Sequence, residues 1–297
     1  MKIGVTGATG FIGKKITTLA IERGHEVIGF TSDSSRKIPD CVETRAFVPD
    51  EPVNIAGCEA MIHLAGENVF GLWTKEKKRR ILRSRKFGTR ALVDAILASQ
   101  SPPRVLVSGS AIGFYGDTGE NPADENTPSG DGFLAEVCRT WEAEALRASD
   151  CGTRVVLLRT GIVLGKNGGA ISAMTPIFKL GFGGKIGCGR QWMSWIHLED
   201  VAALVLFAVE NGEVSGPLNA VAPSPIRNAG FTREVARMLH RPALFTVPSF
   251  VLQMLTGEFS RELLDSKRVM PRQALDRQFL FRFPQLPAAL ADIFSSE

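Results

Sequence analysis

Residues 1–13 read MKIGVTGATGFIG, and this stretch decides the fold. Residues 2–6 form a short apolar alternation typical of a buried strand. Glycines follow at Gly7, Gly10 and Gly13, and an apolar pattern with helical spacing continues beyond them. A strand, a glycine-rich turn and a helix in this order predict a site for the pyrophosphate of a dinucleotide. In such a turn one glycine allows the bend, one lets the backbone approach the pyrophosphate, and one lets helix and strand pack closely.

Apolar runs alternate with amphipathic helical patterns through the first 160 residues. Further strands are expected over 25–31, 60–65, 104–108 and 153–158, and helices over 74–99 and 133–148. This alternation is typical of a parallel sheet that helices cover on both faces. The sequence therefore predicts the α/β class, with a Rossmann-type doubly wound parallel sheet.

The texture changes after Gly165, where glycine-rich loops flank shorter elements. Strands are expected over 192–197 and 217–221, and helices near 173–180, 198–210, 228–240, 248–255 and 287–294. We expect a nucleotide-binding domain over 1–165, to which 198–221 returns, and a smaller C-terminal α/β substrate lobe over 166–297.

The composition is that of an ordinary globular chain. Of 297 residues, 44% are hydrophobic and 22% are charged, and the net charge of +4 does not by itself imply nucleic acid. The five cysteines are scattered without a C-x-x-C pair, which argues against disulfides and zinc and for a reducing cytosol. No apolar stretch approaches about 18 residues, and a strand opens the chain. We therefore expect no metal, no signal peptide, no membrane partner and a cytoplasmic location.

The end of the second strand bears on the choice of dinucleotide, since it meets the adenine ribose in this fold. An acidic residue there favours NAD, whereas a small residue with a nearby Arg admits the 2′-phosphate of NADP. Thr31 and Ser32 end the strand and Arg36 follows, which favours NADP. Asp33 is the competing signal, but it lies beyond the usual acidic position.

The third strand carries His63 inside an apolar run, where a satisfied core histidine is more common than a catalytic base. Glu67 and Asn68 follow this strand and are better placed to touch a ligand, since ligands bind at the carboxyl ends of parallel strands.

The helix expected after Thr74 is unusually basic, with nine Lys or Arg residues over 75–90 against Glu76 alone. A solvated face with one or two arginines directed at the cofactor explains this composition most simply, although a basic helix can also bind a polyanion. Because no interleaved aromatic residues or second basic block accompany it, we expect no nucleic-acid partner.

Several motifs together resemble an extended short-chain dehydrogenase/reductase. They are VTGATGFIG, LAGEN, SGSAIGFYGD, RTGIVLG and WIHLEDVA. The stretches WT-x-E-x-K…SR, GRQWMSWIHLEDVA and VAPSPIRN resemble, more closely, an NADP-binding epimerase-like family, some members of which carry a cell-division-inhibitor label. The likeness covers nearly the whole chain.

The resemblance implies NADP as the cofactor. It places cofactor contacts on Gly7, Thr9, Gly10, Phe11, Ile12, Gly13, Thr31, Ser32, Leu64, Ala65, Glu67, Arg85 and, near the nicotinamide, Val163. The ends of the predicted strands add Arg36 and Ser108 as candidate cofactor-binding residues.

The proton relay that is usual in that superfamily is absent. There a Tyr and a Lys four residues later share a helix face, and the Lys lowers the pKa of the phenol. Tyr115 is the single tyrosine of this chain, and the residue four positions on is Gly119. With Glu142 as a register mark, the Tyr and Lys positions fall on Leu134 and Cys138.

Three functions follow from these observations. The first is an NADP-dependent oxidoreductase or epimerase acting on a small hydroxyl or carbonyl substrate, sugar nucleotides included. Ser110 would hold the substrate oxygen and Tyr115 is the second catalytic candidate, with Glu67 and Asp117 as further options. The second is a non-catalytic NADP-binding protein that reports redox state to a partner. The third is nucleic-acid binding through 75–90. The substrate and the oligomeric state are not predicted.

Overall fold

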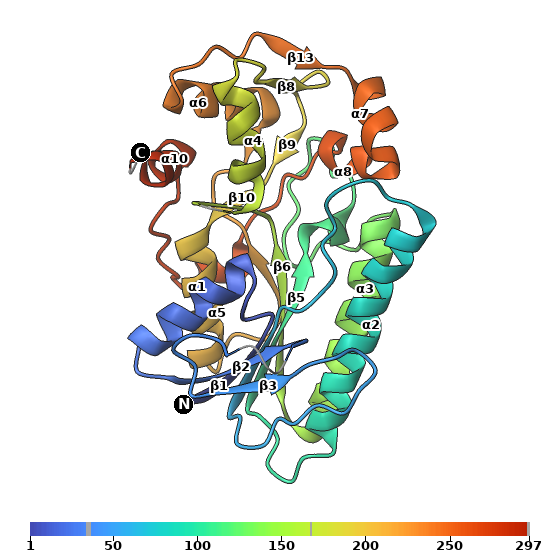
Figure 1. The fold of residues 1–297 in the computed structure, drawn as a ribbon, viewed down its shortest axis with the longest axis vertical. Coiled ribbons are helices and arrows are strands. Elements are labelled where there is room, and N and C mark those ends of the chain that lie inside the picture. Colours follow the sequence, from blue (N-terminus) through green and yellow to red (C-terminus); the bar gives the residue numbers. More distant parts are fainter. Residues whose placement is uncertain (34–36, 167, 296–297) are drawn as a thin grey trace.

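The computed structural model describes residues 1–33, 37–166 and 168–295. A parallel seven-stranded sheet, in the order β11-β6-β5-β4-β1-β2-β3, forms the centre of the lower part of Figure 1. Its strands are β1 (Lys2–Thr6), β2 (Glu26–Thr31), β3 (Glu43–Ala46), β4 (Ala60–His63), β5 (Val105–Ala111), β6 (Arg154–Thr160) and β11 (Gly216–Ala220). This order confirms the expected doubly wound sheet.

Two pairs of helices cover the two faces of this sheet (Figure 1). They are α1 (Phe11–Glu22) with α5 (Leu198–Glu210), and α2 (Lys75–Leu97) with α3 (Phe133–Leu146). The strands are apolar on both sides because both faces are covered. Val5 of β1 and Ile16 of α1 pack in the apolar core between the sheet and the α1/α5 pair. Met61 of β4 and Leu92 of α2 pack in the core between the sheet and the α2/α3 pair.

The boundaries differ from the expected ones in a few places. β3 was missed because its sequence, ETRA, is polar and lies at the edge of the sheet. The expected strand 60–65 ends at His63, since the chain then leaves the sheet toward α2. Thr74 caps α2 as expected, and its hydroxyl accepts a hydrogen bond of 3.1 Å from the backbone N–H of Lys77.

The upper part of Figure 1 contains shorter elements and a core of its own. Its helices are α4 (Gly169–Lys179), α6 (Asn228–Met238), α7 (Ser249–Thr256), α8 (Ser260–Leu264) and α10 (Leu286–Phe294), and its strands are β7 (Ile162–Gly165), β8 (Gly184–Ile186), β9 (Trp192–Met193), β10 (Trp195–His197), β12 (Ile226–Arg227) and β13 (Phe245–Val247). Three short 3-10 helices, η1 (Ile112–Tyr115), η2 (Arg147–Cys151) and η3 (Gly257–Phe259), and α9 (Arg272–Asp276) complete the chain. Trp195, Phe231 and Leu290 lie in this upper core.

The single strand expected over 192–197 is wrong, because two strands interrupted at Ser194 occupy it. The hydroxyl of Ser194 donates to the carbonyl of Lys267 at 2.8 Å and accepts from the N–H of Val269 at 2.8 Å. β9 consequently pairs with β12, whereas β10 pairs with β7.

Two structural features bear on the expectations drawn from composition, namely the state of the cysteines and the length of the apolar helices. All five cysteines are free thiols. No helix in the described part of the chain is long and apolar enough to cross a bilayer.

Candidate functional site at the glycine turn

The glycine turn between β1 and α1 has the geometry that its sequence predicts. Gly7 has φ +71°, a value that L residues rarely adopt. The N–H of Gly10 donates to the Gly7 carbonyl at 2.9 Å and closes the turn. A Cβ on Gly13 would overlap that same carbonyl oxygen, so only glycine lets α1 approach the strand this closely.

The N-terminus of α1 fits an anionic group. Its N-cap is Gly10, and no side chain among the described residues caps the first-turn N–H groups. A helix start with unsatisfied N–H groups and a partial positive charge favours phosphate. Thr9 and Ile12 are partly accessible beside it. The ring of Phe11 packs against Gly168.

A chain of buried hydrogen bonds fixes the adjoining strand ends. The hydroxyl of Thr6 accepts from the N–H groups of Leu64 and Ala65 at 3.1 and 3.3 Å. It lies 2.7 Å from Nδ1 of His63, whose Nε2 lies 3.0 Å from the hydroxyl of Thr89. Burial lowers the pKa of His63 to about 3. His63 is therefore a neutral core residue, which is the interpretation that the sequence favours.

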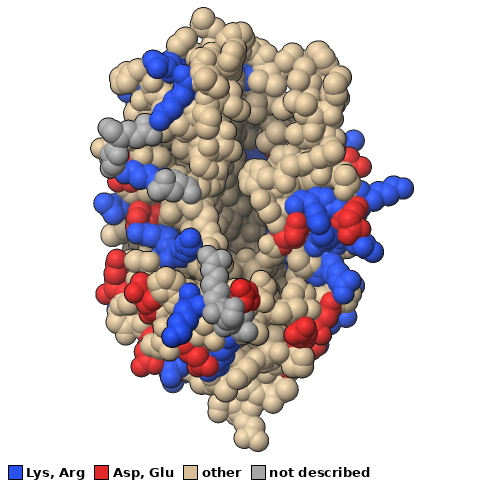
Figure 2. Space-filling view, in the orientation of Figure 1, with Lys and Arg blue, Asp and Glu red and all other residues tan. Residues whose placement is uncertain are grey.

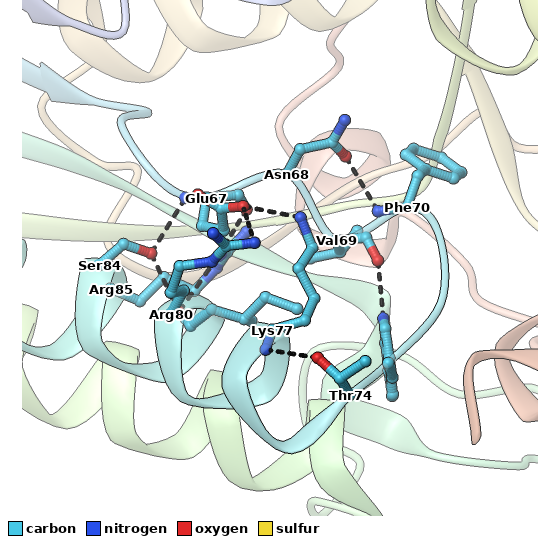
Figure 3. Close-up of polar contacts among 11 residues, drawn as sticks. Glu67, Asn68, Val69, Phe70, Thr74, Lys77, Arg80, Ser84 and Arg85 are labelled. Atoms are coloured by element: carbon cyan, nitrogen blue, oxygen red, sulfur yellow. Dashed lines mark hydrogen bonds and ion pairs between the residues drawn. The ribbon is translucent and has the colours of Figure 1, made fainter. Parts of the chain in front are cut away.

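Residues 66–74, called the strap here, connect β4 to α2 and lie along that helix (Figure 3). The carboxylate of Glu67 accepts from Lys77 Nζ at 2.7 Å, and its N–H donates to Ser84 Oγ at 3.0 Å. The bond from Lys77 holds the pKa of Glu67 below its usual range. The Glu67 side chain is thus directed to α2, whereas Asn68 points away from that helix.

Arg85 lies beneath the first residues of the strap. Its guanidinium donates to the carbonyl of Glu67 at 3.0 Å and stacks over the ring of Trp141, 4.9 Å from the centroid. Burial lowers the pKa of the guanidinium. No carboxylate within the described ranges forms an ion pair with Arg85. A half-buried cation without a counter-ion is suited to an anionic ligand at this edge of the sheet.

A buried polar network begins at Ser110. The Ser110 hydroxyl donates to Glu142 Oε1 at 2.6 Å. Arg159 donates to both oxygens of Glu142 at 2.9 Å. The Glu142 and Arg159 side chains are 7% and 4% exposed, so this ion pair is almost fully removed from water.

The network continues to Tyr115. Arg159 donates to the phenol oxygen at 3.0 Å, and the phenol donates to Asn219 Oδ1 at 2.7 Å. Burial raises the pKa of Tyr115 to about 12, against the lowering effect of Arg159. The hydroxyls of both catalytic candidates are therefore already engaged within the protein.

Sequence reasoning did not assign a role to Arg159 or Glu142. The sequence nevertheless contains a pattern that indicates their pairing: Glu142 is a charged residue within the apolar stripe of α3, and Arg159 follows an apolar run in β6. A buried charge must be paired, so two such residues of opposite sign predict each other.

The other candidates are dispersed around the turn. Thr31 is partly buried at the end of β2 and Ser32 is exposed, whereas Arg36 lies outside the described residues. Val163 lies in β7 and is 9% exposed. Ser108 is fully buried within β5, which does not favour a contact through its hydroxyl, and its role at the cofactor stays a prediction. In the view of Figure 2, a furrow runs down the molecule, and the residues along its walls are mostly uncharged.

Comparison with known proteins agrees with this geometry. A model described as the NAD dependent epimerase/dehydratase family matches residues 3–220, and a domain of unknown function (DUF1731) matches 247–293. The chain belongs to the NAD-dependent epimerase/dehydratase family.

Relatives in this epimerase family extend over the full chain. The epimerase family protein SDR39U1 homolog, chloroplastic, of Arabidopsis thaliana is 37% identical over 99% of this chain and 86% of its own. YfhF of Bacillus subtilis is 35% identical over 99% and 98%. The crystal structure of human SDR39U1 (isoform 2) with NADPH superimposes with a TM-score of 0.92, at 35% identity and over all of both chains.

A second solved structure is a nucleoside-diphosphate sugar epimerase of Corynebacterium glutamicum. It matches with a TM-score of 0.81 and 33% identity, over all of this chain and 59% of its own. The UDP-N-acetylglucosamine 4-epimerase of Bacillus cereus, at 19% identity and a TM-score of 0.79, shares the fold.

In this epimerase family member, the positions expected for the Tyr–Lys relay are apolar. Leu134 packs against Gly113, and Cys138 is 2% exposed. Burial raises the pKa of the Cys138 thiol to about 11, and the thiol donates to the Ala111 carbonyl at 3.6 Å. The thiol therefore stays protonated at neutral pH, as the apolar stripe predicts.

The cations of α2 are largely paired within the protein. The ion pairs among the described residues are Lys77–Glu67, Lys78–Glu258, Arg79–Glu76, Arg80–Glu67, Arg83–Asp50 and Arg90–Glu144. All but the intrahelical Arg79–Glu76 pair join the basic helix to other elements, and together they reduce the charge that it presents to a polyanion.

Proposed function

We propose that this protein binds NADP(H) at the Gly7–Gly13 turn and exchanges hydride with a small substrate that carries a hydroxyl or carbonyl group. The uncapped N-terminus of α1 beside the turn is the observation that carries this proposal. The NADPH in the crystal structure of human SDR39U1 supports it. When bound, the dinucleotide supplies or accepts the hydride, and the protein binds, orients and moves protons.

The N–H groups at the start of α1 would hold the pyrophosphate. Arg85 would donate to an oxygen of the same cofactor, because its guanidinium has no carboxylate partner among the residues that the structure describes. Leu64, Ala65 and Val163 would bound the cofactor with apolar surface, while the carbonyl of Glu67 would hold the guanidinium of Arg85 in place beside it.

Preference for NADP(H) over NAD(H) rests on the end of β2. Thr31 and Ser32 leave room for the 2′-phosphate, and Arg36 would supply the charge that recognises it. Residues 166–297 would form the substrate lobe, apart from 198–221, which return to the large sheet. Because five thiols are free, we place the protein in a reducing compartment and favour the cytosol.

Substrate chemistry centres on Ser110, whose oxygen would hold the reacting oxygen of the substrate. Its single proton is donated to Glu142, so Ser110 is oriented to accept a hydrogen bond from a substrate hydroxyl. Tyr115 is the remaining proton donor, but it would have to exchange its bond to Asn219 for one to the substrate. A general acid or base contributes about 10²–10⁴-fold in rate. Because the sequence lacks the Tyr-x-x-x-Lys pair that usually supplies this proton transfer, hydride transfer should be slow on simple aldehydes, ketones and sugar nucleotides.

A non-catalytic, NADP-sensing role is the second candidate. The engaged hydroxyls of Ser110 and Tyr115 favour it, together with the absence of Tyr-x-x-x-Lys from the sequence. In that case the cofactor affinity would be retained while turnover would be missing.

A substrate screen that follows NADPH absorbance separates the two roles. Ser110→Ala and Tyr115→Phe are measured beside the wild type, with NADPH affinity determined for each. Turnover that falls in Ser110→Ala at unchanged affinity supports the enzyme. Fast turnover that survives both substitutions would show that the active site lies elsewhere. No turnover on any substrate, with affinity intact, favours the sensor.

A further inference from the structure

Large apolar side chains are exposed at one end of the long axis, in the part formed by α4, β8, β13 and α7 at the top of Figure 1. We call six of them the apolar tip: Leu180, Phe182, Leu244, Phe245, Phe250 and Met254, which are between 53% and 86% exposed. The eight residues of α7 include no buried one. Its apolar side chains therefore add to the exposed apolar surface, which in a folded protein often marks an interaction site.

The tip is continuous between its two main segments. The rings of Phe182 and Phe245 lie 5.9 Å apart, and β8 pairs with β13. The guanidinium of Arg241 donates to the carbonyl of Lys179 at 3.2 Å and joins the loop before β13 to the end of α4. Residues 180–182 and 244–245 therefore present one surface, from which α7 continues.

The segments that build the tip are cationic. Residues 166–190 and 235–257 contain six Lys or Arg and no Asp or Glu. They are Lys166, Lys179, Lys185, Arg190, Arg237 and Arg241, of which Arg237 forms an ion pair with Glu234 just outside these segments. We therefore count Lys185, Arg190 and Arg241 as the positive charge of the tip. The top of Figure 2 shows Lys and Arg beside uncharged residues, with no Asp or Glu among them. The partner must accept apolar side chains and positive charge together.

An anionic lipid surface satisfies both requirements. A protruding end with exposed Phe and Leu can enter the boundary between headgroups and acyl chains, while adjacent cations meet the anionic headgroups. A second copy joined through the same patch would bring like charges together. We propose that the apolar tip docks this protein peripherally on anionic membranes. This departs from the sequence-based expectation of no membrane partner, and it requires no spanning helix.

Co-sedimentation of the full chain with vesicles tests the proposal. Vesicles of phosphatidylcholine alone are compared with vesicles that also contain about 30% phosphatidylserine. Binding should occur with phosphatidylserine and weaken as salt rises, since each basic residue near the surface raises partitioning about fivefold. No binding to either vesicle, or equal and salt-independent binding to both, overturns the proposal.

A matched pair of exposed leucines locates the contact. Leu244 in the tip is 86% exposed, and Leu280 outside it is 88% exposed. The double variant Leu244→Asp/Phe250→Asp should lose at least about tenfold in partitioning, whereas Leu280→Asp should match the wild type. Equal losses would contradict the assignment, with circular dichroism confirming that each variant folds.

Charge reversal provides a second test that leaves the apolar residues intact. Lys185→Glu/Arg190→Glu should weaken binding to the phosphatidylserine vesicles and lower its salt dependence. Unchanged binding would contradict the electrostatic part. Light scattering is run on the same samples. A dimer that Leu244→Asp dissociates, or a tip that captures an acidic protein without binding vesicles, would show that a different partner covers the tip.

Discussion

Ser110 and Glu142 are joined by a hydrogen bond of 2.6 Å, and Glu142 is clamped by Arg159 through two bonds of 2.9 Å. A carboxylate can only accept, so the hydroxyl of Ser110 donates and its oxygen remains an acceptor. If Ser110 meets the substrate, its oxygen would therefore accept a hydrogen bond from a donor group on the substrate, such as a hydroxyl. Glu142 of this network lies one helical turn from Cys138, one of the two positions at which the family resemblance leads us to expect a proton relay.

Removing one member of the buried pair should cost stability. Glu142→Gln leaves Arg159 without its counter-ion, and breaking a buried ion pair costs about 3–5 kcal/mol. Urea unfolding at pH 7 measures the loss. Glu76→Gln is the control, since the Glu76–Arg79 pair is exposed and should contribute less than about 1 kcal/mol. Equal losses for the two variants would show that the buried pair has no special role.

Stability should fall as pH decreases through the range in which His63 titrates. Its pKa is about 3 in the folded protein, against 6.5 for an ordinary solvent-exposed histidine, so the unfolded chain binds the extra proton between these values. Below pH 6.5 this residue alone contributes a slope of up to about 1.4 kcal/mol per pH unit. His63→Gln should flatten the dependence of unfolding free energy on pH between 4.5 and 6.5 by roughly that slope. An identical slope in the variant would mean that His63 is protonated when folded.

Thiol reactivity should distinguish two cysteines. Cys188 is exposed, whereas Cys138 is buried and its pKa is raised to about 11. Because the thiolate is the reactive form, brief iodoacetamide treatment at pH 8 should label Cys188 and leave Cys138 unmodified until the protein unfolds. Peptide mass spectrometry reads out both sites. Labelling of Cys138 at the rate of Cys188 would place it in an open environment.

The turn itself can be tested with a single methyl group. Gly13→Ala puts a Cβ into the carbonyl of Gly7, so the turn must deform and NADPH affinity should fall by tenfold or more, which corresponds to at least about 1.4 kcal/mol. Gly212→Ala, at a loop position with open space around it, should bind like the wild type. If Gly13→Ala binds NADPH as tightly as the wild type, the glycine turn does not form part of the cofactor site.

The sequence predicts the nucleotide-binding half of the fold well because local and global signals agree there. Glycine spacing marks the β1–α1 turn, apolar runs mark the strands buried on both faces, and Thr74 marks the start of α2, and each local signal agrees with the global fold. β3 is not predicted from the sequence, because a polar edge strand lacks the apolar run by which strands are recognised. The break at Ser194 depends on hydrogen bonds to residues more than 70 positions away, which no local pattern encodes.

The candidate site could be predicted only in part. The turn lies at the carboxyl edge of the sheet, where its motif indicates. Arg85, which only the family resemblance suggests, lies on α2 beside the strap, and its role at the cofactor stays a prediction. The engagement of Ser110 and Tyr115 by Glu142, Arg159 and Asn219 could not be predicted, since these residues meet only after distant elements pack together. The burial of Ser108 likewise depends on its neighbouring strands.

The most direct test of the central claim is calorimetric titration of the wild type and Arg85→Ala with NADPH and with NADH. The wild type should bind NADPH more tightly than NADH, and Arg85→Ala should lose about 1–3 kcal/mol of NADPH binding, as a charge-assisted contact implies. Arg79→Ala, an exposed position on the same helix, is the control and should bind normally. Failure of the wild type to bind either dinucleotide, or equal affinity for both with Arg85→Ala unchanged, would contradict the account.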